Sequence, residues 1–361
     1  KENKILLMPL DETVGITPGS RVTSCPQQLT IPVGDELKGR VLDGLGNPID
    51  DKGPIKCKEH YPVFNTPPAP LKRKRIDTQL STGIRSIDGL IPIANGQRVG
   101  IFSGSGVGKS VSMGMIARNT SAEINVIALI GERGREVREF IENDLGEEGM
   151  KRSILVVATS DQAPYIRLKA SLTATAIAEY FRNQGMDVML MMDSLTRVAQ
   201  AQREVGLAVG EAPTTKGYTP SVFAFLPRLL ERTGTNEIGS ITGLYSVLVE
   251  GDDLSDKDTQ LILQVLADRG KLEGEAQVKE LQDLNKLFGI VSSVVHSSVP
   301  HLVTDIGLAM KNGNLGNFAN TQISADQNTQ TNVNYTDNSM AVYNREIITQ
   351  SLNSSVLALQ S

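Results

Sequence analysis

Cysteine, aromatic residues and long apolar runs are all scarce in this chain of 361 residues. It has only two cysteines, Cys25 and Cys57, so no disulfide framework is implied and a reducing compartment is the default expectation. Aromatic residues make up 4% of the chain and the formal net charge is −5, which argues against a nucleic-acid-binding surface with stacking platforms. No signal peptide is recognisable at Lys1 and no apolar run reaches membrane-spanning length, so we expect a soluble globular protein.

A glycine-rich stretch near residue 105 stands out against this background. Residues 99–102 read VGIF, long enough for a buried strand, and the turn SGSGVG follows before Lys109-Ser110 open a predicted helix. The backbone N–H groups of such a turn converge on an anion, and the helix N-terminus adds its partial positive charge. The stretch is therefore predicted to bind a nucleoside triphosphate. The candidate residues are Ser103, Gly104, Ser105, Gly106, Val107, Gly108, Lys109, Ser110 and Val111.

Two side chains of this loop have separate predicted roles. Lys109 reaches the β- and γ-phosphates, and the Ser110 hydroxyl is a ligand for Mg²⁺. Ser103 departs from the phosphate-loop pattern G-x-x-x-x-G-K-[ST], because it stands where the first glycine belongs. The alternative is an ordinary glycine-rich turn, but Gly-Lys-Ser between a strand and a helix favours the phosphate loop.

Apolar runs and helical patterns alternate between residues 83 and 256, which is typical of an α/β fold with a parallel sheet and helices on both faces. Ligands on such a sheet bind beyond the carboxyl ends of the strands, where the glycine-rich turn, Glu132 and Asp193 all fall. The strands predicted after the turn are residues 124–132, 153–160, 187–193 and 239–253, and the helices are residues 110–118, 134–144, 165–181 and 194–205.

Glu132 and Asp193 are candidate catalytic and metal-binding carboxylates. An apolar strand that ends in an aspartate, downstream of a phosphate loop, suits the carboxylate that holds Mg²⁺, so Asp193 is predicted to take that role. The alternative is a helix cap at Asp193-Ser194. Hydrolysis needs a group that orients the attacking water, and Glu132 is predicted to provide it. Its alternative is an exposed charge at the end of a strand.

The segments outside this region read differently. Residues 1–66 are short apolar runs cut by proline and glycine, which predicts a small antiparallel β-domain, incomplete at its start. Residues 67–82 are a predicted linker, in which the basic run 72–75 is interpreted as a solvated face and not as a nucleic-acid patch. Helical periodicity marks residues 257–311, and residues 312–361 are rich in Asn, Gln, Ser and Thr, which favours a poorly packed or disordered tail.

Several motifs carry a family resemblance over about residues 1–256. GERGREVREF, LMMDSLTR, AQREVGLAVGEAPTTKGYTPSVFAFLPRLLERTG and GSITGLYSVLVEGDD resemble the flagellar and type III secretion protein-export ATPases, with LMPLDETVGI and LKRKRID closer to the flagellar branch. These are homohexameric relatives of the catalytic subunit of the rotary ATP synthase. The resemblance implies a β-barrel domain followed by a RecA-like ATPase domain, with ATP and Mg²⁺ as cofactors.

The resemblance also assigns roles to residues and partners. It implies that Glu132 activates the attacking water, that Arg133 contacts the phosphates, and that Arg197 lies beside Glu132. Lys109 and Ser110 would bind phosphate and Mg²⁺, with Asp193 supporting the metal. The implied partners are export substrates and their chaperones, together with regulatory and stalk proteins of the export apparatus, and not nucleic acid. The implied location is the cytoplasmic side of the inner membrane, at the export gate.

Three functions remain open at this point. The first is an export ATPase. The second is a nucleotide-binding but catalytically impaired relative, because the family segment that ends in an arginine finger is not recognised after Asp256. The expectation is slow hydrolysis with little acceleration at higher protein concentration, unless Arg269 or another arginine takes the role of the finger. The third is a RecA-like hexamer that acts on RNA, which the acidic charge and the few aromatics disfavour.

Overall fold

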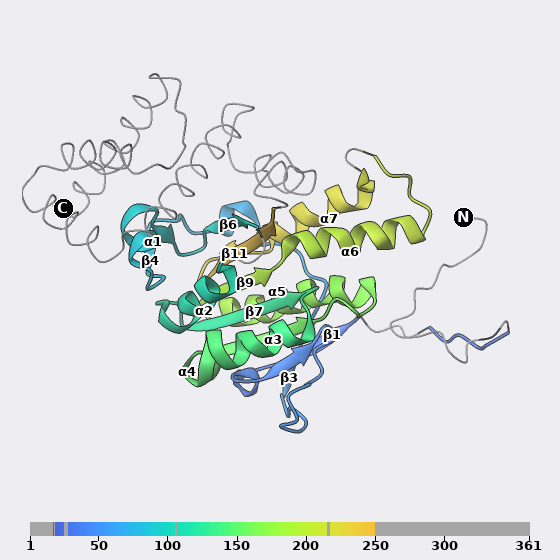
Figure 1. The fold of residues 1–361 in the computed structure, drawn as a ribbon, viewed down its shortest axis with the longest axis horizontal. Coiled ribbons are helices and arrows are strands. Elements are labelled where there is room, and N and C mark those ends of the chain that lie inside the picture. Colours follow the sequence, from blue (N-terminus) through green and yellow to red (C-terminus); the bar gives the residue numbers. More distant parts are fainter. Residues whose placement is uncertain (1–16, 18, 25–27, 105–106, 215–216, 250–361) are drawn as a thin grey trace, which may run out of the picture. The chain divides into compact units, whose positions relative to one another are not determined.

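The computed structural model describes Thr17 and residues 19–24, 28–104, 107–214 and 217–249 (Figure 1). The predicted helical segment 257–311, the polar tail 312–361 and Arg269 lie outside these residues, as do Ser105 and Gly106 of the glycine-rich turn.

Parallel strands form the central sheet of the described chain. Their order is β6 (Arg98–Ser103), β11 (Ser240–Leu248), β9 (Asp187–Asp193), β7 (Ile124–Ile130), β8 (Ser153–Ala158) and β2 (Val41–Asp43). The short β10 (Gly234–Thr235) pairs with the start of β11 in the antiparallel direction. β11 therefore lies between the strand that leads into the glycine-rich turn and the strand that ends at Asp193. The predicted parallel sheet is confirmed.

Helices cover both faces of this sheet (Figure 1). One face is covered by α2 (Lys109–Asn119), α3 (Gly134–Glu139), the π-helical turn η3 (Phe140–Leu145) and α4 (Gly146–Lys151). The other face is covered by α5 (Pro164–Asn183), α6 (Leu195–Ala208) and α7 (Pro220–Glu231). The predicted α/β architecture with helices on both faces is confirmed.

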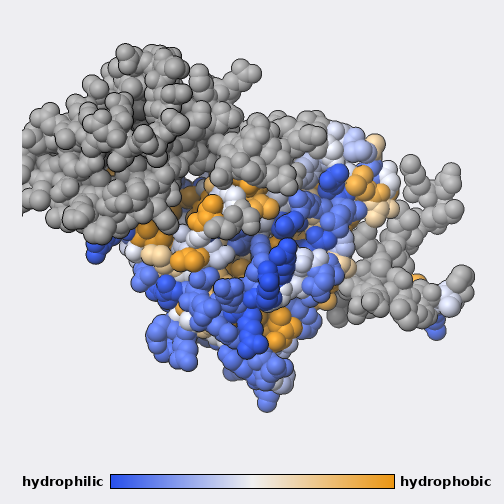
Figure 2. All heavy atoms as spheres, in the orientation of Figure 1, coloured by the Kyte–Doolittle hydropathy of each residue, from blue (hydrophilic) through white to orange (hydrophobic). Residues whose placement is uncertain are grey.

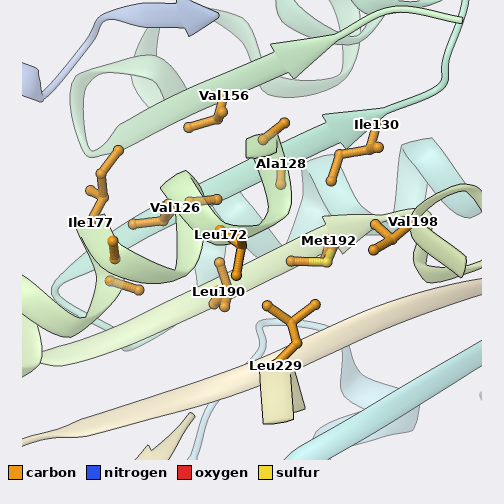
Figure 3. Close-up of a cluster of buried hydrophobic side chains, with 14 of the residues drawn as sticks. Val126, Ala128, Ile130, Val156, Leu172, Ile177, Leu190, Met192, Val198 and Leu229 are labelled. Atoms are coloured by element: carbon orange, nitrogen blue, oxygen red, sulfur yellow. The ribbon is translucent and has the colours of Figure 1, made fainter. Parts of the chain in front are cut away.

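The core explains why the strands read as continuous apolar runs. Successive side chains of β7 point to opposite faces: Val126 and Ala128 join the cluster under α5 and α6, whereas Ile127 and Leu129 join the cluster under α2 and η3. Figure 3 shows the first cluster, where Leu172 and Ile177 of α5 lie over the strands. Both faces are buried, so polar residues cannot alternate with apolar ones along the strand.

The N-terminal region differs in part from the β-domain that the sequence predicts. β1 (Thr30–Val33) and β3 (Glu59–Pro62) do form a two-stranded antiparallel sheet. However, β2 pairs with β8 in the central sheet, with Val41 opposite Leu155. The apolar side chains of β2 are buried there, so this short strand is stabilised by the core of the large sheet and not by a separate domain. The shorter elements are η1 (Asp35–Leu37), η2 (Pro70–Lys72), β4 (Gln79–Leu80), α1 (Arg85–Leu90) and β5 (Ile93–Ala94).

Residues of the predicted linker pack against the α/β region. The Arg73 guanidinium donates to the carbonyl of Thr233 at 2.8 Å and pairs with the Glu231 carboxylate at 3.2 Å. Leu80 in β4 is buried. The sequence predicts the basic run 72–75 as a solvated face, but Arg73 points inward because carbonyls at the end of α7 need donors. Arg98 of β6 pairs with the same Glu231 carboxylate.

A buried ion pair joins the N-terminal region to α5 and α7. Arg232 donates to both carboxylate oxygens of Glu179 at 2.8 Å, and its remaining nitrogen donates to the carbonyl of Val63 at 3.0 Å. Every charged partner is satisfied in this arrangement, which is the condition for a buried pair to be tolerated.

Lys169 is buried without such a partner. Its side chain lies on α5, the residue is 2% exposed, and its Nζ stands 3.7 Å from the ring centre of Phe64 and 4.7 Å from that of Tyr165. Among the described residues no carboxylate pairs with it, so its charge is stabilised by the two aromatic faces. Burial lowers the pKa of Lys169 to about 8.

Replacement of Lys169 by methionine is expected to stabilise the fold at pH 7 by about 1–3 kcal/mol, because a desolvated charge is removed and the volume is kept. The folded-state pKa lies below the ordinary value of 10.5, so the cost of the charge is complete below pH 8 and disappears as pH rises toward 10.5. Urea unfolding at pH 7 and pH 10 would measure the gain and its decline. Lys72→Met, at an exposed lysine, is the control and is expected to change little. A gain independent of pH would contradict this account.

The visible surface is largely hydrophilic, with small separate apolar areas (Figure 2). Among the described residues, no helix has both the length and the apolar character needed to cross a membrane.

Candidate functional site

The glycine-rich turn connects β6 to α2 at the carboxyl edge of the sheet. β6 ends at Ser103, and α2 begins at Lys109 directly after Gly108, which has a φ of +86°. That backbone conformation favours glycine, and it turns the chain so that the first N–H groups of α2 face outward. Val107, Ser110 and Val111 are exposed here. The Ser103 hydroxyl is buried and has no hydrogen-bond partner within the described structure.

Lys109 and Asp193 are brought together, as strand-end geometry requires. Lys109 Nζ lies 2.6 Å from Asp193 Oδ1, and the two side chains are 13% and 4% exposed. The Asp193 carboxylate also accepts a hydrogen bond from Ser246 Oγ at 2.6 Å. The helix cap at this position is Ser194, whose hydroxyl accepts from the backbone N–H of Arg197. Asp193 is therefore not needed as a cap.

Glu132 lies close enough to this pair to be affected by its charges. The pKa of the Glu132 carboxyl is raised to about 7, first by burial and then by the negative charge of Asp193, while the ammonium of Lys109 opposes the rise. A carboxyl that titrates near neutral pH is suited to accept a proton from water.

Arg197 of α6 lies against the carboxyl end of β7. Gly131 precedes Glu132 with a φ of +75°, and a Cβ built on it would lie 2.8 Å from Arg197 Cγ and 2.9 Å from Arg197 Cβ. The stem of Arg197 therefore packs on Gly131, and a side chain at position 131 would displace it. The guanidinium donates to Gln200 Oε1 at 3.1 Å. Arg197 thus packs against the residue that precedes Glu132, and the position beside Glu132 that the resemblance implies for it stays a prediction.

Arg133 is placed differently from the other predicted site residues. Its side chain is 69% exposed, and its guanidinium lies 3.7 Å from Glu136 Oε1 at the start of α3. Its contact with phosphate stays a prediction.

Two polar side chains at this edge are not found by sequence reasoning. Ser246 contacts Asp193, and the Thr196 hydroxyl accepts from the backbone N–H of Leu248 at 3.0 Å. Both contacts arise because β11 lies next to β9, and no local sequence signal shows which strands are neighbours.

The donor set fits a magnesium ion bound together with phosphates. The described residues contain no cluster of three or more metal-binding side chains. Mg²⁺ in nucleotide sites takes one or two protein oxygens and completes its shell with phosphate oxygens and water. The exposed Ser110 hydroxyl and the Asp193 carboxylate are donors of this kind.

The site has the features of a P-loop nucleotide-binding domain on a RecA-like sheet. These features are a glycine-rich turn at the start of a helix, a lysine beside an aspartate, and a second carboxylate at a neighbouring strand end. The model of the ATP synthase alpha/beta family nucleotide-binding domain matches residues 83–277. The match passes residue 256, where the resemblance read from the sequence stops. The chain belongs to this family, in the branch of the flagellar and type III secretion ATPases.

Individual relatives agree with this placement. A flagellum-specific ATP synthase of Bacillus subtilis is 54% identical over 306 residues, covering 82% of this chain and 69% of its own length. A type 3 secretion system ATPase of Xanthomonas euvesicatoria is 50% identical over 296 residues, covering 82% and 67%. The structure of the assembled ATPase EscN from enteropathogenic E. coli has a TM-score of 0.68 at 46% identity, covering 72% of this chain and 63% of that one. The chain thus spans about two thirds of the length of these relatives.

Proposed function

We propose that this chain hydrolyses ATP with Mg²⁺ and couples the reaction to protein export through a flagellar-type secretion apparatus. The observation that carries the proposal is the grouping of Lys109, Asp193 and Glu132 at one edge of the sheet, where burial and the charge of Asp193 raise the pKa of Glu132 to about 7. Membership of the export ATPase family supports the same chemistry.

The proposal assigns a role to each of these side chains. The N–H groups at the start of α2 and the ammonium of Lys109 bind the phosphates. Ser110 and Asp193 would hold Mg²⁺, which would supply positive charge to neutralise the β- and γ-phosphates. Glu132 orients the attacking water and accepts its proton, and Arg197 and Arg133 stabilise negative charge that develops on the phosphoryl group.

The finer assignment of partners belongs to the same proposal. Solved structures describe EscN as an assembled ATPase, and one of them contains its central stalk EscO. By this likeness we propose a homohexamer that contacts a stalk protein, export substrates and their chaperones at the inner membrane. A neighbouring subunit would then supply the arginine finger, a group worth about 10³–10⁵ in rate.

Hydrolysis of Mg-ATP by the full 361-residue chain, measured against protein concentration with the mass of the species in parallel, tests the proposal. The sequence alone predicts slow hydrolysis, but the family match extends past Asp256 to residue 277. We therefore expect turnover that EDTA removes and that increases steeply as the chain assembles. Binding of ATP without turnover at any concentration would instead support the catalytically impaired relative. Retention of turnover in EDTA would contradict the assigned metal site.

A further inference from the structure

The role of Ser246 is not explained by the packing of the sheet alone. Ser246 lies on β11, opposite Ile101 of β6, and is 1% exposed. Its hydroxyl donates to Asp193 Oδ1 on the neighbouring strand β9 at 2.6 Å. A short hydrogen bond to a charged acceptor inside the protein is among the stronger ones.

Two donors share this oxygen, and their side chains differ in conformational freedom. Lys109 Nζ lies 2.6 Å from the same Oδ1 but stands at the end of a long side chain at the start of α2. Its proposed role requires it to turn toward phosphate oxygens. Ser246 has a single short side chain on a buried central strand, so its hydroxyl stays beside Asp193 in either arrangement.

We propose that Ser246 is a positioning residue: its hydroxyl fixes Oδ1 of Asp193, so that this carboxylate keeps the orientation that supports Mg²⁺ when Lys109 turns to the phosphates. The inference rests on the proposed function, since it assigns to Asp193 a role toward the metal. Ser246 itself does not touch the reacting atoms.

The chain offers a matched control on the same two strands. Ser240 Oγ donates to Asp187 Oδ1 at 2.6 Å, at the opposite end of β11 and β9. Ser240→Ala removes an equivalent serine–aspartate bond far from the glycine-rich turn. A general loss of sheet stability would therefore show in both variants, whereas a loss of metal support would show only in Ser246→Ala.

The experiment measures the affinity of the full chain for ADP in Mg²⁺ and in EDTA, by titration with a fluorescent ADP analogue. For Ser246→Ala we expect the Mg²⁺-dependent gain in affinity to fall roughly five- to tenfold, the net size of one ordinary hydrogen bond. Affinity in EDTA stays within about twofold. Ser246→Thr restores the gain because it keeps the hydroxyl, and Ser240→Ala leaves it unchanged.

A double-mutant cycle with Asp193→Asn shows whether Ser246 acts through Asp193. If it does, adding Ser246→Ala to Asp193→Asn causes no further loss of the Mg²⁺-dependent gain. If Ser246→Ala does not fold, Ser246→Cys replaces it, since the thiol is a weak donor and the same direction is expected. An unchanged Mg²⁺-dependent gain in Ser246→Ala overturns the inference. Absence of any such gain in the unaltered chain overturns the proposed function itself.

Discussion

Replacement of Lys109 by alanine is expected to weaken ATP binding roughly ten- to a hundredfold and to reduce turnover to background. The ammonium is the cation that lies at the carboxyl edge of the sheet beside Asp193, and charge-assisted hydrogen bonds to phosphate are worth about 1.5–3 kcal/mol each. Equilibrium binding of a fluorescent ATP analogue and a phosphate-release assay measure the two effects.

A loss of folding would give the same result for a trivial reason, so the variant needs a structural control. Asp193 keeps the hydrogen bond from Ser246 when Lys109 is removed, and for this reason the domain should remain folded. The control substitution is Lys151→Ala, at a lysine that pairs with Glu148 on the exposed side of α4. It is expected to leave binding and turnover unchanged. Near-normal turnover by a folded Lys109→Ala protein would contradict the assignment of the nucleotide-binding site.

The part of the site that could be predicted from sequence is the part that follows from strand ends. Glu132 and Asp193 stand at the ends of apolar strands, and Lys109 follows the glycine-rich turn that leaves another; parallel strands place their carboxyl ends at one edge. The structure brings these three together. The resemblance to a family added Arg197, which lies against Gly131.

The remaining features depend on which segments become neighbours, and local sequence does not encode that. β2 joins the edge of the central sheet beside β8, more than a hundred residues away, because its apolar side chains are buried there. Arg73 sits in a basic run that reads as solvated, and only the ends of α7 and β10 explain its position. In the sequence, Ser246 reads only as a small residue within a strand. Its contact with Asp193 follows once β11 is known to lie beside β9.

Replacement of Glu132 by glutamine should separate binding from chemistry. Glutamine keeps the size and the hydrogen-bonding oxygen but accepts no proton, so we expect kcat to fall roughly 10²–10⁴-fold while nucleotide affinity changes only a few-fold. Single-turnover hydrolysis and equilibrium binding measure the two quantities. Glu123→Gln, just before the opposite end of β7, is the matched control and should not affect either. An unchanged kcat would reduce Glu132 to a structural carboxylate.

The Glu132→Gln substitution has a second, independent consequence, which is a change in the stability of the fold measured in EDTA. The folded-state pKa of Glu132 is raised to about 7 from its ordinary value of 4.5, chiefly by burial. The folded protein therefore holds this proton more tightly than the unfolded chain, and ionisation destabilises the fold as pH rises from 4.5 to 7. Glu132→Gln removes that ionisation, so the variant should be more stable than the parent above pH 7, and the difference should vanish as pH falls toward 4.5. Urea unfolding across this range measures it. If the two proteins show the same dependence on pH, then the pKa of Glu132 is not raised in the folded protein, and Glu132 is not poised to act as a base near neutral pH.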